Sequence, residues 1–235
     1  LVRIYRGCHF NVISESTAED MVARGVPEED ISIIHCGIDR ERYAYDPSVA
    51  KFDRPTVLYL GRIKKYKSVQ HLIAAFRQVI DILPEAQLMI VGDGDYVRPL
   101  QKQVKVLGLE DRVEFPGFVP SDDKVERMRR AHVAVLPSPK EGWGLTNIEA
   151  NSVGTAVIAA NSPGLRDSVR DGETGYLYEY GNIGQLAEKL LVILQNETER
   201  KRLEQGGLAW AETFKWDDAA RKFEQVAIDI VEGRR

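Results

Sequence analysis

The fold is decided by two near-continuous apolar runs, Val57-Leu58-Tyr59-Leu60 and Leu88-Met89-Ile90-Val91. A strand with one solvated face alternates apolar and polar residues, whereas a strand buried on both faces does not. Both runs therefore indicate strands inside a parallel sheet. With these two, the short strand candidates lie at Phe10 to Ser14, Ile31 to Ile34, Thr56 to Leu60, Gln87 to Val91, Arg112 to Phe115, His132 to Leu136, Thr155 to Ala160 and Gly175 to Tyr178.

Amphipathic helical patterns alternate with these strands. The clearest runs from Val69 to Leu83, with apolar residues at three-and-four spacing and Pro84 directly after it. Ser16-Thr17-Ala18-Glu19 is interpreted as a capping box that opens a short helix. Two more helices are predicted, from Asn182 to Leu194 and from Trp216 to Val231. The alternation predicts right-handed βαβ units, and hence an α/β fold with a doubly wound, Rossmann-like parallel sheet.

The chain is expected to contain one main domain. Arg54-Pro55 marks its start, and we assign residues 54–215 to it. Residues 1–53 contain a separate strand–helix–strand piece and are interpreted as the tail of a preceding domain with its linker. Residues 216–235 form a C-terminal helix. Because the chain opens on Leu1 without a methionine, we expect an N-terminal truncation.

Composition restricts the classes of function. The 235 residues (26.5 kDa) are 43% hydrophobic and 29% charged, an ordinary globular balance. A net charge of −4 gives no general attraction to nucleic acid, so no nucleic-acid partner is expected. The two cysteines, Cys8 and Cys36, form no metal-binding pair, and no apolar run approaches the roughly 18 residues that span a bilayer. These features favour a reducing, cytoplasmic location.

Ligands of open parallel sheets bind beyond the carboxyl ends of the strands. The segment after the first strand of the main domain is Gly61-Arg62-Ile63-Lys64-Lys65-Tyr66-Lys67, with four cations in six positions directly before a helix. Arginine and lysine at such a place bind phosphate, and the helix N-terminus adds partial positive charge. A solvated, lysine-rich turn is the alternative interpretation.

The next two loops give weaker signals. Gly92-Asp93-Gly94-Asp95 begins a dinucleotide-binding pattern, but Val97 stands where the third glycine is needed. The same segment spells the metal-binding pattern D-x-D. In a tight turn before a helix, however, an aspartate is typically a cap, so no metal ligand is expected. In the loop Gly117-Phe118-Val119-Pro120, Phe118 either borders a base or belongs to the core.

The most informative segment follows the fourth strand of the main domain: Glu141-Gly142-Trp143-Gly144-Leu145-Thr146-Asn147-Ile148-Glu149. Glycines flank Trp143 before a helix, so the backbone can approach a ligand closely and direct N–H groups toward an anion. Glu141 and Glu149 stand on either side of this turn, and carboxylates accept hydrogen bonds from sugar and ribose hydroxyls. For Glu149 alone, interaction with the helix dipole is a sufficient explanation.

These segments together resemble family 4 glycosyltransferases, which have the GT-B fold. Glu141 to Glu149 fits the family's E-x7-E pattern, with Trp143 where phenylalanine is usual. Gly61-Arg62 followed by Lys67 is similar to the family's diphosphate-binding arginine and lysine. Further segments stand in the family's order at Ile90 to Gly94, Val113 to Gly117 and Asp171 to Gly175, and Ile33 to Tyr43 is similar to its hinge.

The sequence departs from the family pattern at two places. Ser68 follows Lys67 where glycine or asparagine is frequent. Ala150-Asn151-Ser152 follows Glu149 in place of the commoner Ala-Met-Ala. Both changes are small, so they affect only the fine geometry expected of the site.

The resemblance implies that the chain is the C-terminal, donor-binding half of a GT-B enzyme. Such an enzyme is a retaining transferase, here expected to move a hexose from a nucleotide-diphosphate sugar to an acceptor hydroxyl without metal or cofactor. Arg62 and Lys67 would neutralise the departing diphosphate, Glu141 would hold the sugar, and Glu149 would hold the ribose. The other substrate-binding residues implied are Gly92, Val119, Gly142, Trp143, Gly144, Leu145 and Thr146.

The partners implied are a nucleotide-sugar donor and an acceptor that is a glycan, a lipid or a small molecule. The missing N-terminal domain would bind the acceptor and make any peripheral contact with a membrane. Two alternatives remain open: a nucleotide-sugar-binding module that is inactive on its own, and a dinucleotide-binding oxidoreductase domain. The incomplete glycine pattern at Gly92 argues against the second.

Overall fold

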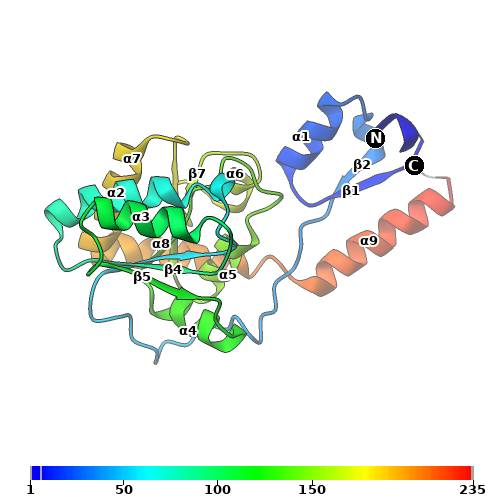
Figure 1. The fold of residues 1–235 in the computed structure, drawn as a ribbon. Helices are drawn as coiled ribbons and strands as arrows, with labels where there is room; N and C mark the ends of the chain where they lie inside the picture. Colours follow the sequence, from blue (N-terminus) through cyan, green and yellow to red (C-terminus); the bar gives the residue numbers. More distant parts are fainter. Residues whose placement is uncertain (1, 6, 234–235) are drawn as a thin grey trace.

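The computed structural model describes residues 2–5 and 7–233, which form a large α/β domain and a small N-terminal unit (Figure 1). Leu1, Arg6, Arg234 and Arg235 lie outside the described residues, so the predicted segments 1–53 and 216–235 are covered only in part. No helix within the described ranges has both the length and the apolar character needed to cross a bilayer.

In the described part of the chain, the large domain is built on six parallel strands in the order β5-β4-β3-β6-β7-β8. Its first strand, β3, lies in the middle, and later strands are added on both sides. This order confirms the predicted doubly wound, Rossmann-like sheet. The strands are β3 Thr56–Leu60, β4 Gln87–Val91, β5 Val113–Gly117, β6 Val133–Leu136, β7 Ala156–Ala160 and β8 Gly175–Tyr178.

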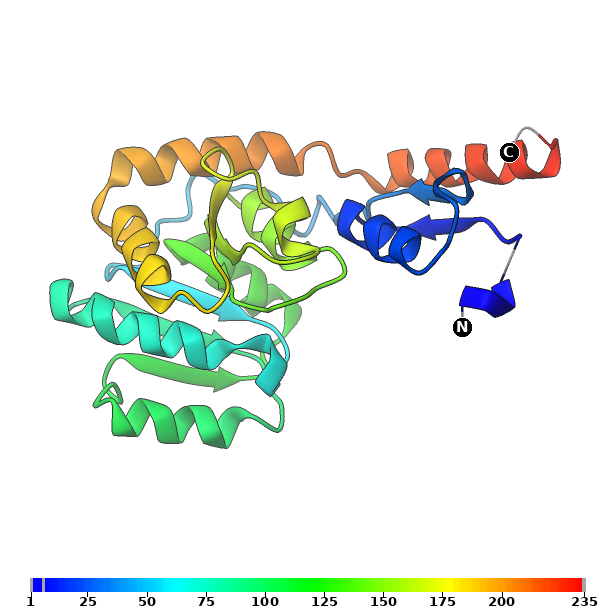
Figure 2. The same ribbon diagram turned by 90° about the horizontal axis from the view of Figure 1, so that it is seen from above.

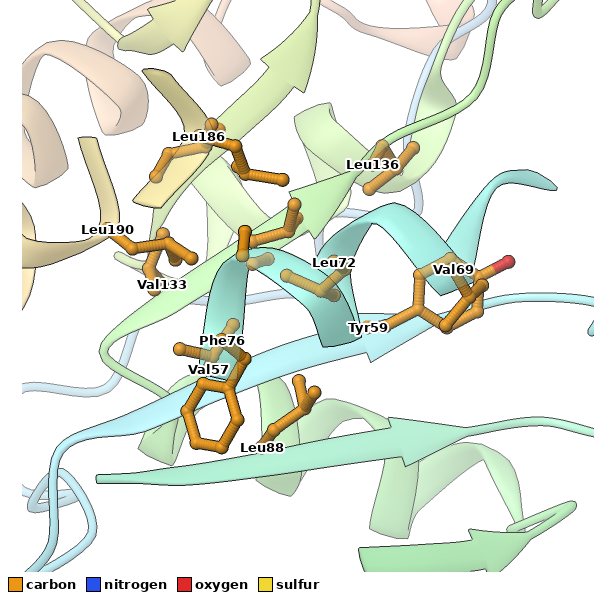
Figure 3. Close-up of a cluster of buried hydrophobic side chains, with 14 of the residues drawn as sticks. Val57, Tyr59, Val69, Leu72, Phe76, Leu88, Val133, Leu136, Leu186 and Leu190 are labelled. Carbon is orange, nitrogen blue, oxygen red and sulfur yellow. The ribbon is translucent and has the colours of Figure 1, made fainter. Parts of the chain in front are cut away.

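The core lies between the sheet and the helices α2 (Val69–Ile82) and α7 (Ile183–Gln195). Figure 3 shows Leu72 and Phe76 of α2 directed at the sheet strands, with Leu190 of α7 beside them. All three side chains are fully buried, and each such burial contributes about 1.5–3 kcal/mol to stability. The helix ends before Pro84, as its sequence predicts.

Helices cover both faces of the sheet. α2, α3 and α7 lie on one face, and α4 lies on the other, where Val125 and Met128 pack against Leu58 and Met89 (Figure 1). The remaining bounds are α3 Val97–Val106, α4 Ser121–Arg130, α5 Leu145–Ser152, α6 Leu165–Ser168 and α8 Glu197–Ala211, with 3-10 turns η1 Val2–Tyr5, η2 Glu28–Asp30 and η3 Lys65–Lys67.

The small unit consists of β1 (Phe10–Val12), α1 (Glu15–Ala23) and β2 (Ile31–Ile33), with β1 and β2 paired in parallel. The predicted capping box was wrong by two residues. Ser14 has the extended backbone of an N-cap, and its side chain accepts a hydrogen bond from the N–H of Thr17. The C-terminal helix α9 (Trp216–Val231) leaves the large domain and runs beside this unit (Figures 1 and 2).

The chain crosses between the small unit and the large domain twice, and the two crossings touch. The N–H of Ile38 donates to the carbonyl of Phe214 at 3.2 Å. A Cβ atom on Gly37 would lie 2.4 Å from the backbone nitrogen of Trp216, so only glycine permits this approach. Polar contacts also join the two parts, since Ser16 of α1 donates both its N–H and its hydroxyl to Asp167 at 3.0 Å.

Candidate functional site

A cavity of about 350 Å³ opens at the carboxyl edge of the sheet, beyond β3 and β6. This is the edge at which parallel sheets bind ligands. The small unit closes one side with Ile13 and Cys36. The large domain supplies the other lining residues, which are Tyr59, Leu60, Gly61, Lys67, Leu136, Ser138 and the segment 141–146.

An ion pair lies in this cavity. Nζ of Lys67 is 2.5 Å from Oε1 of Glu141, and the side chains are 14% and 18% exposed. The turn η3 carries Lys67 into the cavity, and the loop after β6 carries Glu141 toward it. Partial burial lowers the effective dielectric constant and strengthens the attraction between the two charges. The pair therefore places a cation and a hydrogen-bond acceptor together at a ligand-binding edge.

The other cations of the first loop do not line the cavity. Arg62 is exposed and lies outside the lining. Lys64 donates to Asp95 at 2.8 Å on the surface, and Lys65 is exposed. Of these four residues, Lys67 alone belongs to the cavity. The interpretation as a purely solvated turn therefore fails for Lys67.

The loop after β4 packs against the loop after β3. Gly92 has a φ of 133°, and a Cβ atom there would lie 1.9 Å from the carbonyl oxygen of Gly61. Because it has no side chain, Gly92 lets the loop after β4 touch the loop after β3. Gly92 itself lies outside the cavity lining. The predicted aspartate cap was wrong: Tyr96 is the N-cap residue of α3, and the Asp93 carboxylate accepts from the N–H of Gly94 at 2.7 Å.

Acidic residues are not gathered into a metal site in the described chain. Within residues 2–5 and 7–233, no group of three or more histidine, cysteine, aspartate or glutamate side chains is placed to hold a metal ion. Asp93 and Asp95 each make the separate contacts given above.

The N-terminus of α5 faces the cavity. Its N-cap residue, Gly144, has a φ of 73°, and a Cβ atom there would lie 2.6 Å from Oγ of Ser168. Among the described residues no side chain caps this helix, and Leu145 and Thr146 line the cavity. The first N–H groups of a helix are without intrahelical partners and attract anions. The arrangement therefore offers hydrogen-bond donors in the same cavity as the Lys67–Glu141 pair.

Trp143 belongs to the seam between the two parts of the molecule. Its ring stacks on His35, with ring centroids 4.3 Å apart, and meets the edge of Phe214 at 5.3 Å. The side chain is only 3% exposed, and within the described chain its Nε1 has no hydrogen-bond partner. Trp143 thus lines the cavity while its ring packs against the hinge segments.

Glu149 lies outside the cavity lining, one turn further along α5. It is 9% exposed and accepts a hydrogen bond from Nζ of Lys124 at 2.9 Å. Burial lowers the pKa of Lys124, but hydrogen bonds to Glu149 and Tyr43 outweigh burial and leave that pKa above its usual value. Interaction with the helix dipole is therefore not a sufficient explanation for Glu149.

The third loop contributes a side chain to the surface. Phe118 is 85% exposed, so the interpretation of this residue as part of the core was wrong. Val119 is half-buried and packs against the cluster beneath α4, outside the cavity lining.

The cavity contains some of the residues named from the sequence and others that were not named. The structure brings together Lys67 and the segment 141–146, and leaves Arg62, Gly92, Val119 and Glu149 outside the lining. Ile13, Cys36, Tyr59 and Ser138 were missed. Position at the carboxyl ends of strands was a signal for Tyr59 and Ser138, but the approach of Ile13 and Cys36 depends on how the small unit docks.

The two departures from the family pattern have local causes. Ser68 has a φ of 56°, a left-handed conformation that glycine and asparagine adopt most easily. Asn151 is fully buried, and its Nδ2 donates to the carbonyl of Thr174 at 3.1 Å. It thereby ties α5 to the segment before β8.

Comparison with known proteins identifies relatives that match nearly the whole chain. The chain is 30% identical over 230 residues to phosphatidyl-myo-inositol mannosyltransferase of Mycobacterium leprae, covering 95% of this chain and 61% of that protein. It is 32% identical to D-inositol 3-phosphate glycosyltransferase of Streptomyces bingchenggensis, covering 94% of this chain and 53% of that protein. The chain therefore spans little more than half the length of these relatives.

A solved structure shares the fold. The crystal structure of Anabaena HepE in complex with UDP and glucose superposes with a TM-score of 0.88 at 22% identity, covering 97% of this chain and 66% of that one. The model of the family described as "Glycosyl transferases group 1" matches residues 44–210, which include Lys67, Glu141 and the N-terminus of α5. The chain is therefore a member of the group 1 glycosyltransferases, with the Rossmann-like sheet of the GT-B fold.

Proposed function

We propose that this chain binds the nucleotide-diphosphate sugar of a retaining glycosyltransferase and supplies the donor half of its active site. The observation that carries the proposal is the Lys67–Glu141 ion pair, which lies in the same cavity as the uncapped N-terminus of α5. One end of this cavity suits a diphosphate, and the carboxylate beside it suits sugar hydroxyls.

The charges of this site would act on the leaving group. As the glycosidic bond breaks, negative charge grows on the diphosphate, and fixed donors placed there lower the barrier. Lys67 would exchange its contact with Glu141 for one with a phosphate oxygen, which frees Glu141 to hold the sugar. The first N–H groups of α5, at Leu145 and Thr146, would receive the other phosphate oxygens.

Arg62 would supply the second cation. Its side chain is exposed, but its backbone is fixed, because the hydroxyl of Tyr59 donates to the carbonyl of Arg62 at 2.9 Å. A long side chain on a fixed backbone reaches a bound ligand without moving the loop. With two cations and the helix N-terminus at the diphosphate, we propose that the transfer needs no metal ion.

The reaction would join the donor sugar to an acceptor hydroxyl with retention at the anomeric carbon. We propose hexosyl transfer, which the mannosyltransferase among the relatives supports. Residues 1–53, with the unit β1-α1-β2, would be the tail of an acceptor-binding domain and its linker, and residues 54–215 would form the donor domain. The acceptor-binding domain would bind a glycan, a lipid or a small molecule, and would contact a membrane where the acceptor is a lipid.

Calorimetric titration of the chain with UDP, GDP, ADP and their sugars tests donor binding, with NAD as the competing ligand. We expect one nucleotide diphosphate to bind and NAD not to bind; the reverse result would favour a dinucleotide-binding oxidoreductase. Assayed alone, the chain is expected to bind the donor without transferring sugar. In a protein that includes the acceptor domain, NMR of the product should show the anomeric configuration of the donor.

A further inference from the structure

Glu149 is held by residues from two other parts of the chain. Its Oε2 accepts a hydrogen bond from Nζ of Lys124 on α4 at 2.9 Å, and the same ammonium group donates to Oη of Tyr43 at 2.7 Å. Three segments distant in sequence thus meet at one carboxylate.

Tyr43 is itself fixed at the end of the hinge-like segment. The residue is 7% exposed. Its carbonyl accepts from the hydroxyl of Ser152 at the end of α5 at 2.8 Å, and its N–H donates to the carbonyl of Asp39 at 2.9 Å. Its hydroxyl therefore has a defined place relative to α5, and there it accepts the hydrogen bond of the Lys124 ammonium group.

Glu149 lies next to the cavity along the helix. It follows Leu145 by four residues, and such residues lie on the same face of a helix, about 6 Å apart along its axis. Leu145 lines the cavity. A ligand whose phosphates bind at the N-terminus of α5 therefore has its next group within reach of Glu149.

The buried carboxylate of Glu149 needs a counterion if it is to stay charged and accept hydrogen bonds. A charge that is 9% exposed is costly to bury unless it is paired. Lys124, at 23% side-chain exposure, provides the pairing from α4. A carboxylate that is ionised and fixed can accept several hydrogen bonds, whereas a protonated or rotating one presents fewer acceptors in the right place.

We infer that Lys124, held by Tyr43, is a positioning residue that aims Glu149 at the two hydroxyls of a ribose, and so makes the site selective for ribonucleoside diphosphates over their deoxy forms. The inference rests on the proposed function and adds a specificity device to it. The rival explanation is that the contact between Lys124 and Glu149 only holds α4 against α5 and has no effect on selectivity.

Selectivity separates the two explanations. The nucleoside diphosphate that binds best among UDP, GDP and ADP is titrated calorimetrically beside its 2′-deoxy and 3′-deoxy forms. For the wild-type chain we expect the ribonucleotide to bind about tenfold more tightly, the scale of one hydrogen bond to a charged group. In Lys124→Met the affinity for the ribonucleotide should fall about tenfold while the affinity for the deoxy forms stays, so that the selectivity disappears.

The conservative variant and a matched control complete the test. Lys124→Arg keeps the charge and should retain most of the selectivity, while Lys102→Met removes an exposed lysine of α3 and should change nothing. If Lys124→Met does not fold, as judged by circular dichroism, Tyr43→Phe replaces it. That variant keeps the ring and removes the hydroxyl, and should lose about half of the selectivity, expressed as the logarithm of the affinity ratio.

The possible results are distinguishable. Equal losses of affinity for the ribonucleotide and the deoxy forms would show a purely structural role for Lys124 and overturn the inference. Selectivity that survives Lys124→Met would also overturn it, and Tyr43→Phe takes the place of that variant if it does not fold. A wild-type chain that binds the ribonucleotide and deoxy forms equally would also overturn it, but would leave donor binding intact. If the wild-type chain binds none of the nucleotides, the proposed function fails first.

Discussion

Nζ of Lys67 lies 2.5 Å from Oε1 of Glu141, although 74 positions of sequence separate the two residues. Without a ligand, the positive charge expected to bind a diphosphate is already neutralised by the carboxylate expected to bind the sugar. We expect donor binding to rearrange this pair, so that variants of the two partners should have opposite effects.

Glu141→Gln should strengthen the binding of a nucleoside diphosphate that carries no sugar. Removing the carboxylate leaves Lys67 free for the phosphates and removes a nearby like charge, with an expected gain of about 1 kcal/mol. In the protein with its acceptor domain, kcat should fall because the sugar loses its acceptor group. Calorimetry and steady-state kinetics measure the two effects, and a weaker affinity for the diphosphate would contradict the exchange of partners.

Lys67→Ala and Arg62→Ala should each weaken diphosphate binding by about 1–3 kcal/mol, the usual range for a hydrogen bond to a charged group. Lys65→Ala and Lys64→Ala are the matched controls, since Lys65 is exposed and Lys64 is paired with Asp95. Equal, salt-sensitive losses in all four variants would indicate a general electrostatic patch in place of a specific site.

Donor binding should not depend on a divalent metal ion. The positive charges at the proposed diphosphate site come from side chains and from the N-terminus of α5, and Asp93 and Asp95 are engaged with Gly94 and Lys64. Titration with EDTA present and with added Mg²⁺ or Mn²⁺ should give the same affinity. If EDTA abolished binding, the two aspartates would have to be considered as metal ligands.

Much of the fold and part of the site follow from the sequence. The strands at Val57 to Leu60 and Leu88 to Val91 were predictable because burial on both faces leaves a continuous apolar run. α8 was not predicted, and it contains Gly206 and Gly207, which disfavour a helix interior. The structure explains them: a Cβ atom would lie 2.1 Å from the carbonyl oxygen of Glu173 at Gly206, and 2.5 Å from Nδ2 of Asn151 at Gly207.

In the site, too, some features follow from the local sequence and others depend on tertiary packing. Lys67 and Glu141 could be predicted because each follows a strand at the binding edge. The contacts of Lys124 with Glu149, and of Trp143 with His35, depend on the packing of distant segments, and no local pattern in the sequence marks them.

Acid should destabilise the protein through His132. Burial, and next the charges of Arg200 and Lys51, lower the pKa of His132 from 6.5 to about 4, and its Nδ1 accepts from the N–H of Thr56 at 3.1 Å. The unfolded chain therefore binds a proton at higher pH than the folded one. The stability that His132 contributes is present above pH 6.5 and is lost as the pH falls through about 4, by up to about 3 kcal/mol.

Urea unfolding at pH 7, 5.5 and 4 measures this loss. His132→Asn keeps an acceptor close to the position of Nδ1 but does not titrate, so its stability should fall less steeply with acid. His9→Asn, in the small unit, controls for the removal of a histidine. Parallel pH profiles for wild type and His132→Asn would contradict the assignment.

Ser68→Gly should be more stable than Ser68→Ala by about 1 kcal/mol. Both variants lose the contact between the Ser68 hydroxyl and Oη of Tyr180 at 3.0 Å, so that loss cancels in the comparison. The remaining difference is the cost of a side chain at a φ of 56°. Thermal and urea unfolding of both variants give the value, and equal stabilities would show that the backbone at this position relaxes.

The contact between Gly37 and Trp216 also bears on how the protein can be rebuilt. The chain enters and leaves the large domain at one place, so residues 38–215 are connected to the rest like an insertion whose ends meet. A domain with adjacent ends can be exchanged without stretching the segments that hold it. The region between Gly37 and Trp216 is thus a natural cassette for chimeras, in which a relative's domain changes the donor while the small unit and α9 stay the same.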